Sequence, residues 1–203
     1  MADFSAQDVQ RLRQSAGVGM MDAKKALTEA GGDIESAMEI LRERGLAKMA
    51  KRADREAAEG TIGSYLHEQD GRTKSAVIVH LASETDFVAK SDEFREVAKD
   101  IAMHIAWFKP RYITREEVPA DELEKEQQFI AKQAANEGKP EQVIPKIVEG
   151  RMSKYFEENV LLDQTFVNTE KFDGTVGDMI QQLAQKMGEN IHVRTFSRLA
   201  VGE

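Results

Sequence analysis

The sequence predicts an α+β fold, in which helices pack on a three-stranded antiparallel sheet. Residues 61–67 and 74–81 are rich in β-prone side chains, and the Asp70-Gly71 pair between them is typical of a tight hairpin turn. Apolar residues recur at helical spacing through most of the remaining chain. A chain of 203 residues with this mixture favours one or two small domains.

Residues 1–45 are expected to form three short helices. Ser5 provides a hydroxyl N-cap for the first helix, and the glycines at 31–32 end the second in the left-handed conformation. Asp33 can cap a third helix, which Gly45 closes. So few aliphatic side chains make a marginal core, which is typical of a recognition module attached to a larger body.

The next residues, 46–60, are expected to form a basic helical linker. The segment from Arg42 to Arg55 carries a net charge of +4. This charge fits either a nucleic-acid contact or a solvated connection, and the lack of interleaved aromatic side chains favours the connection. Residues 1–60 carry a net charge of −1 and residues 61–203 a net charge of −7. The linker therefore joins a small module to a more acidic main body.

Residues 61–203 are expected to form the α+β core. After the strand hairpin, one helix stops before Pro110, because the residue before a proline resists the helical conformation. A helical hairpin projects over residues 114–158, and its second arm contains Pro145, where the helix either starts or kinks. A last helix, ended by Gly188, is followed by a third strand.

The composition limits the classes of function. A net charge of −8 argues against nucleic-acid binding, because phosphate neutralisation needs a positive field. The absence of cysteine excludes disulfides and zinc-thiolate sites and fits a reducing compartment. The sequence has no apolar run of membrane-spanning length, and its N-terminus lacks the features of an export signal. We therefore expect a soluble cytoplasmic protein that binds neither nucleic acid nor membrane.

The common catalytic templates are missing from the sequence. It contains no G-x-x-x-x-G-K-[ST] phosphate loop and no G-x-S-x-G nucleophile, and the His67-Glu68 pair lacks the second histidine of a metalloprotease. The four histidines are scattered along the chain. We therefore expect no catalytic residue, no metal site and no cofactor, and a protein that is not an enzyme.

A few apolar and aromatic residues have more than one interpretation. Met20 and Met21, between glycines and a helix, either fill the core of the module or offer an adaptable contact to a partner helix. Phe87 follows a strand at a corner that could be exposed, although the sequence alone favours a buried position. His104 lies among apolar residues of its helix and is expected to be a packed histidine.

Five short motifs follow one another along nearly the whole chain. They are Val9-x-x-Leu12-Arg13 with Gly17-Val18-Gly19-Met20-Met21-Asp22-Ala23-Lys24-Lys25-Ala26-Leu27, Thr85-Asp86-Phe87-Val88-Ala89-Lys90, Ile101-Ala102-Met103-His104-Ile105-Ala106, Glu149-Gly150-Arg151-Met152 and Gly188-Glu189-Asn190-Ile191-x-Val193-Arg194. In this order they resemble the elongation factor Ts family, the guanine-nucleotide exchange factors of bacterial elongation factor Tu. Each motif is weak by itself, whereas the five together are specific.

The resemblance implies that residues 1–45 are a three-helix, ubiquitin-associated-like bundle. In this family the bundle docks on the GTPase domain of elongation factor Tu. Leu12, Met20 and Met21 occupy the matching contact positions. Longer family members carry two related core subdomains, whereas this chain has length for one. We therefore expect two copies to pair as a homodimer through their sheets, because a single small sheet leaves an edge unprotected.

The resemblance also implies which residues act on the partner's nucleotide. Asp86 and Phe87 match the pair that intrudes beside the magnesium site of the GTPase, and Thr85 and Val88 complete that motif. His104 matches a histidine that pushes near the phosphate-binding loop. The implied function is exchange of GDP on elongation factor Tu, bound in its GDP and nucleotide-free forms. The alternative is a non-enzymatic adaptor or chaperone whose N-terminal module binds another partner.

Overall fold

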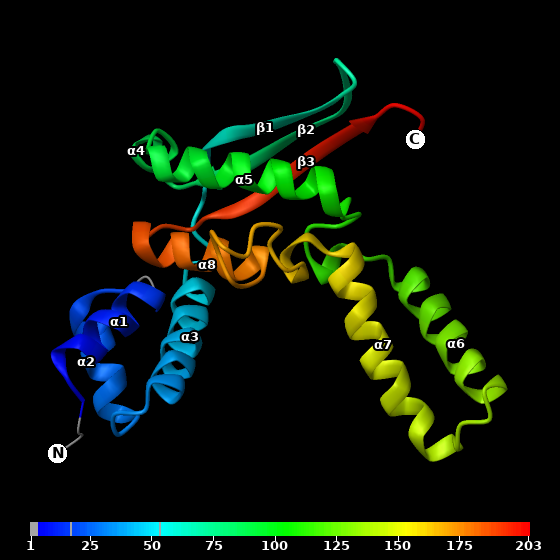
Figure 1. Cartoon of the computed structure of the whole chain (residues 1–203), viewed down its shortest axis with the longest axis horizontal. Coiled ribbons are helices and arrows are strands. Elements are labelled where there is room, and N and C mark those ends of the chain that lie inside the picture. The colour runs from blue at the N-terminus through cyan, green and yellow to red at the C-terminus, as the bar shows by residue number, and fades with distance from the viewer. Residues whose placement is uncertain (1–3, 17, 53) are drawn as a thin grey trace. The chain divides into compact units, whose positions relative to one another are not determined.

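The computed structural model describes residues 4–16, 18–52 and 54–203; Gly17 of the first motif lies outside them, as do the side chains of residues 46 and 48–50. The chain combines helices with a three-stranded antiparallel sheet of strand order β1-β2-β3 (Figure 1), so the predicted α+β class is confirmed. The chain passes more than once between two compact units. The first comprises Met1–Gly63, Val79–Lys99 and Asp178–Arg194, and the second comprises Ser64–Ile78, Asp100–Gly177 and Thr195–Glu203.

The first unit begins with the three predicted helices. Ser5 and Asp8 cap the first helix reciprocally, because the Asp8 N–H donates to Ser5 Oγ at 3.2 Å and the Ser5 N–H donates to Asp8 Oδ2 at 2.8 Å. The Ser36 N–H donates to Asp33 Oδ1 at 2.7 Å and starts the third helix. Seven buried aliphatic side chains form the core between them. The helices are α1 (Ala6–Ala16), α2 (Met20–Glu29) and α3 (Ile34–Ala50).

The end of α3 differs from the prediction. The helix continues through Gly45 to Ala50, and the described residues from 51 to 58 form turns and extended chain instead of helix. Gly45 lies inside the helix and does not end it. A Cβ there would meet the side-chain amide of Gln185 on helix α8 (Val176–Met187). Gln181 of α8 also donates to the carbonyl oxygen of Arg42 at 3.3 Å. The predicted helical linker over 46–60 is therefore helical only in its first residues.

Basic side chains around this linker make contacts within the first unit. Arg42 pairs with Asp178 at 3.2 Å, Arg44 pairs with Glu29, and Arg52 Nη1 donates to the carbonyl oxygen of Ala184 at 3.2 Å. Internal pairing of this kind favours the interpretation of the segment as a connection.

The sheet is built around the predicted hairpin. Asp70 and Gly71 both have positive φ, 53° and 74°, as a two-residue type I′ turn requires. Gly63 allows β1 to approach helix α5 closely, because a Cβ there would lie 2.2 Å from the carbonyl oxygen of Ala98. The elements are β1 (Glu59–Gln69), β2 (Arg72–Ser83), α4 (Asp86–Ala89), α5 (Asp92–Phe108) and β3 (His192–Ala200).

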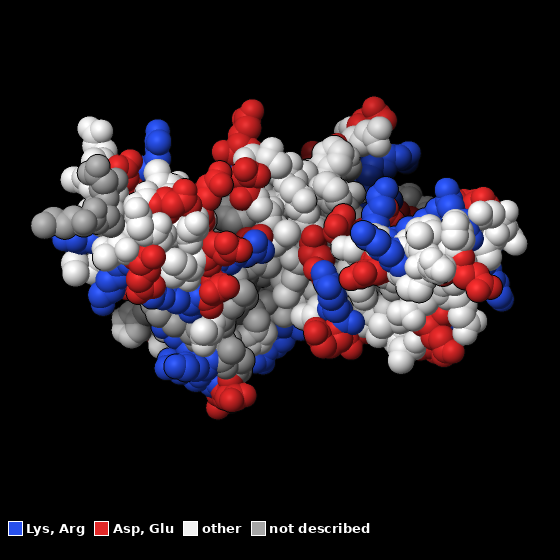
Figure 2. All heavy atoms as spheres, turned by 90° about the horizontal axis from the view of Figure 1, so that it is seen from below, with Lys and Arg blue, Asp and Glu red and all other residues white. Residues whose placement is uncertain are grey.

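The second unit contains the helical hairpin. Its arms are α6 (Ala120–Asn136) and α7 (Ile144–Asn159), joined through a turn at Gly138. Pro145 occupies the first turn of α7, so the helix starts there and does not kink. On the face shown in Figure 2, basic and acidic side chains of the hairpin are interspersed and do not gather by sign. Three short 3-10 turns flank the arms: η1 (Arg115–Glu117), η2 (Glu141–Val143) and η3 (Leu161–Asp163).

A single carboxylate ties the base of the hairpin together. Glu122 of α6 accepts hydrogen bonds from the Tyr155 hydroxyl at 2.5 Å and from the Tyr112 hydroxyl at 2.8 Å, and Arg111 donates to both of its oxygens. These bonds, that of Tyr155 above all, lower the pKa of Glu122 to about 2. The charged carboxylate is therefore the form that the fold stabilises.

We expect Glu122→Gln to lower the melting temperature at pH 7, because the neutral amide has one acceptor oxygen in place of the two charged oxygens of the carboxylate. The pKa of Glu122 is depressed from its ordinary value of 4.5, so this stabilisation is complete above about pH 4.5 and is lost as the pH falls toward 2. Thermal denaturation at pH 7 and pH 2.5 should show the difference from wild type shrinking at low pH. Glu126→Gln on the same helix is the control, and an equal difference at both pH values contradicts the prediction.

Candidate protein-interaction site

Phe87 lies on a one-turn helix directly after β2. Thr85 caps this helix, since its hydroxyl oxygen accepts the Val88 N–H at 3.4 Å. Ala89 fills the buried position of the turn, whereas 84% of the Phe87 surface is exposed. The expectation from sequence alone of a buried Phe87 is therefore wrong, because a four-residue helix buries one side only. We call residues 84–89 the Phe87 turn.

The exposed phenyl ring of Phe87 can contribute free energy to binding another protein. An isolated exposed phenylalanine gains nothing on folding, but its complete burial against another protein contributes on the order of 2 kcal/mol. Asp86 stands beside it, with its carboxylate 2.5 Å from the Lys90 ammonium. That hydrogen bond lowers the pKa of Asp86, so the carboxylate is charged at neutral pH. The turn thus presents an apolar ring next to the ion pair of Asp86 and Lys90.

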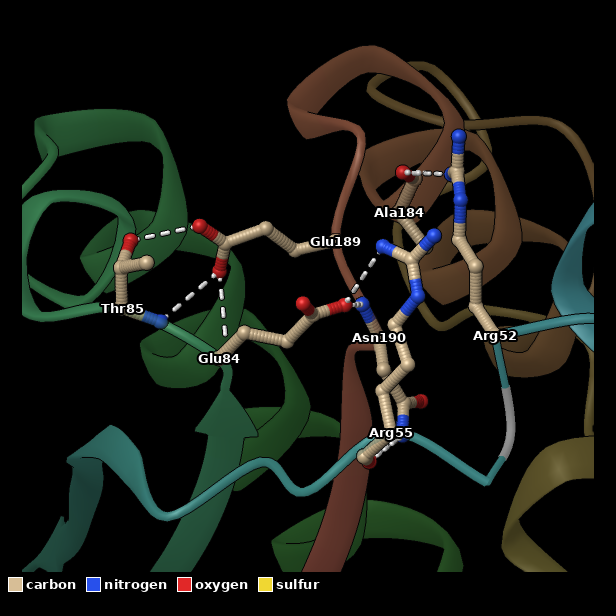
Figure 3. Close-up of polar contacts among 7 residues, drawn as sticks. All are labelled: Arg52, Arg55, Glu84, Thr85, Ala184, Glu189 and Asn190. Atoms are coloured by element: carbon tan, nitrogen blue, oxygen red, sulfur yellow. Dashed lines mark hydrogen bonds and ion pairs between the residues drawn. The ribbon is translucent and has the colours of Figure 1, made fainter.

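Two glutamates hold the start of the Phe87 turn (Figure 3). Glu189, just after α8, accepts hydrogen bonds from the backbone N–H groups of Glu84 and Thr85 at 3.0 and 3.1 Å, and from the Thr85 hydroxyl at 2.5 Å. In return, Glu84 accepts the Asn190 N–H at 2.6 Å. Sequence reasoning assigned neither glutamate a role, although Glu189 belongs to the last motif. The available signal was an acidic residue directly after the glycine that ends a helix.

The predicted docking residues of the N-terminal module divide into two kinds. Met20 and Met21 lie in the first turn of α2 and are 51% and 63% exposed, so the partner-contact interpretation fits them better than the core interpretation. Leu12 of α1 is fully buried among the apolar side chains of α1–α3. Leu12 therefore packs in the core of the module, beneath the surface that carries Met20 and Met21, and does not itself reach solvent.

His104 lies in the second unit and is fully buried. The Val167 N–H donates to Nδ1 at 3.2 Å, so the ring proton sits on Nε2, which is 3.0 Å from Gln164 Oε1. The ring stacks on Phe108 and Phe166 at centroid distances of 4.8 and 5.9 Å. The sequence-based expectation of a packed histidine is confirmed.

Burial lowers the pKa of His104, so we expect its ring to be mostly neutral in the folded protein at pH 6.5, where a free imidazole is half protonated. As the pH falls below the ordinary value of 6.5, the unfolded chain binds a proton that the folded ring does not, and stability decreases. Imidazole ¹⁵N NMR should show the Nε2–H tautomer, with the signal assigned by its loss in His104→Gln. A ring that is half or more protonated at pH 6.5 contradicts this arrangement.

An open groove of about 810 Å³ runs along the hairpin. Its apolar lining includes Ile144, Val148, Met152 and Phe156.

In the part of the chain that the structure describes, no three histidine, aspartate or glutamate side chains come together as a potential metal site. Among the same residues, no helix combines the length and the apolar character needed to cross a membrane.

Comparison with known proteins extends over the whole fold. The family model of elongation factor Ts matches residues 3–203. The elongation factor Ts of Desulforamulus reducens is 51% identical over 203 residues, which cover 100% of this chain and 91% of that protein. The elongation factor Ts of Fervidobacterium nodosum is 51% identical over 201 residues, or 99% of this chain and 100% of that protein.

The α+β fold and these matches place the chain in the class of translation elongation factors, proteins that serve protein biosynthesis. Within that class, it belongs to the elongation factor Ts family.

Proposed function

We propose that this protein is a guanine-nucleotide exchange factor that binds elongation factor Tu with GDP and promotes GDP release. The observation that carries the proposal is the exposed Phe87 beside the charged Asp86, on a turn held by contacts to Glu189. A GTPase holds GDP through phosphate contacts and a magnesium ion. A partner that binds best when these contacts are broken must weaken GDP binding, since coupling between two ligands is reciprocal.

The parts of the chain have separate tasks in this proposal. Residues 1–45 dock on the GTPase domain through Met20 and Met21, supported by Leu12, and residues 46–60 connect them to the core, residues 61–203. The motif Thr85, Asp86, Phe87 and Val88 displaces the magnesium ion of the partner. No bond is made or broken, so the protein acts without catalytic residues or a cofactor.

His104 has a further requirement. To contact the phosphate-binding loop of elongation factor Tu, its ring must leave Gln164 and Val167 when the complex forms, because both ring nitrogens are occupied in the free protein. The same ¹⁵N signals, recorded in the complex, test this step. An unchanged Nε2–H ring in an active complex assigns His104 to the support of α5.

Release of a fluorescent GDP analogue from elongation factor Tu tests the function directly. Acceleration by substoichiometric protein is the expected result, since an exchange factor turns over. No acceleration rejects the proposal and leaves the adaptor or chaperone interpretation, in which only the N-terminal module is needed for binding. A variant that still binds elongation factor Tu but no longer accelerates GDP release separates the exchange activity from binding.

We also propose that two copies pair through their sheets. Leu66 on β1 and Ile78 on β2 are 60% and 53% exposed, so the sheet offers apolar side chains that a second copy can cover. Leu66→Lys is therefore expected to shift sedimentation at tens of micromolar from dimer to monomer. Phe129→Lys, at an exposed phenylalanine of α6, is the control that should leave the dimer intact. A wild-type monomer at this concentration contradicts the proposal.

A further inference from the structure

The segment that follows α8 brings a carboxylate to the beginning of the Phe87 turn. Gly188, with φ of 76°, ends the helix in the left-handed conformation and turns the chain back toward the sheet. Glu189 is the next residue; its Oε2 accepts the backbone N–H groups of Glu84 and Thr85, and its Oε1 accepts the Thr85 hydroxyl (Figure 3). The contact joins residues more than one hundred positions apart in the sequence.

This contact satisfies donors that the turn cannot satisfy by itself. The N–H groups of Glu84 and Thr85 lie between the last residue of β2 and the first residue of α4. Both donate to Glu189 Oε2, at 3.0 and 3.1 Å, while the Thr85 hydroxyl donates to Oε1. Hydrogen bonds to a charged carboxylate are stronger than neutral ones, so three of them restrict the backbone here.

The reverse contact holds Glu189 in its place. Glu84 Oε1 accepts the Asn190 N–H at 2.6 Å and lies 3.6 Å from Arg55 Nη1. Asn190 Nδ2 in turn donates to the Arg55 carbonyl oxygen at 2.9 Å. Figure 3 shows these side chains converging from three separate chain segments. A one-turn helix has no cooperative stability of its own, so its direction depends on such external contacts.

We infer that Glu189 is a positioning residue for Phe87: its carboxylate fixes the Glu84–Thr85 backbone and thereby the direction in which the phenyl ring is presented. The inference rests on the proposed exchange function and adds a residue to it. Glu189 acts through the turn and does not contact the nucleotide. Loss of its carboxylate therefore lowers the maximal rate of GDP release without weakening the docking of the N-terminal module.

The test compares full-length Glu189→Gln and Glu189→Ala with wild type on elongation factor Tu loaded with a fluorescent GDP analogue. The maximal release rate at saturating protein is expected to fall about tenfold in Glu189→Ala, as for the loss of one good charge-assisted contact. The protein concentration at half-maximal rate should not change. Glu170→Gln, at an exposed glutamate, is the matched control and should behave as wild type.

Amide hydrogen exchange on the free protein tests the contact independently of activity. Faster exchange at Glu84 and Thr85, with unchanged protection in α1–α3, supports the inference. Thr85→Val removes one of the three donors, and its effect on the rate should be less than additive with Glu189→Ala. An unchanged maximal rate, a shift in the half-saturating concentration alone or unchanged exchange at these two amides overturns it. If the wild-type protein does not accelerate GDP release from elongation factor Tu, the proposed function fails. The amide hydrogen exchange data still decide whether Glu189 orders the turn.

Discussion

Phe87→Ala is expected to slow the maximal rate of GDP release by about 30-fold or more. The ring is 84% exposed in the free protein, so its truncation removes no packing from the fold. Its burial in the complex contributes on the order of 2 kcal/mol, and about 1.4 kcal/mol corresponds to a factor of ten. If this energy is used only when the magnesium site opens, it appears in the rate and not in the docking affinity. Stopped-flow release of a fluorescent GDP analogue measures both.

Phe129→Ala is the matched control for this variant. Phe129 lies on α6 and is also an exposed phenylalanine, at 62%. Its truncation should leave the release rate unchanged. Phe87→Leu keeps part of the apolar surface and should retain an intermediate rate. Wild-type kinetics in Phe87→Ala would remove the main support for the exchange mechanism.

The second large effect concerns the N-terminal module. Combined substitution of Met20 and Met21 by alanine is expected to raise the dissociation constant for elongation factor Tu by at least about tenfold, because two exposed, adaptable side chains lose their contacts. The melting temperature should stay near that of wild type, since both side chains are more than half exposed. Isothermal titration calorimetry and thermal denaturation measure the two quantities.

Leu12→Ala distinguishes a surface contact from core support. Leu12 is fully buried, so its truncation should destabilise α1–α3 by about 2–5 kcal/mol and weaken docking only through that loss. Faster amide exchange in α1–α3 should therefore accompany any weaker binding. Weaker binding with unchanged protection would instead place Leu12 in the interface.

Local chemistry made most of the elements predictable. Ser5 and Asp33 cap helices as expected, and the Asp70-Gly71 pair forms the hairpin turn. These outcomes depend on residues within four positions of each other, which the sequence displays directly. The same local reasoning failed at Gly45, which lies inside α3 beside the distant Gln185.

The candidate site was less accessible to sequence reasoning. Burial of Phe87 could not be decided locally, because the fate of its ring depends on the length of a one-turn helix and on what Ala89 packs against. The role of Glu189 depends on a tertiary contact to Thr85 across 104 residues. His104 was correctly placed in a helix interior, but its partner Gln164 lies 60 residues away.

The contacts between α8 and the N-terminal helices have a consequence for the kinetics of association. Gln181 and Asp178 of α8 bind Arg42, and the Phe87 turn, α8 and the N-terminal helices belong to one compact unit. The three-helix module is therefore not joined to the Phe87 turn by a flexible linker alone. Once Met20 and Met21 engage a partner, Phe87 meets its target as an intramolecular event, at an effective concentration that no free collision reaches. A weak second contact then suffices to open the nucleotide site. The burial of one phenyl ring, which contributes on the order of 2 kcal/mol, is such a contact.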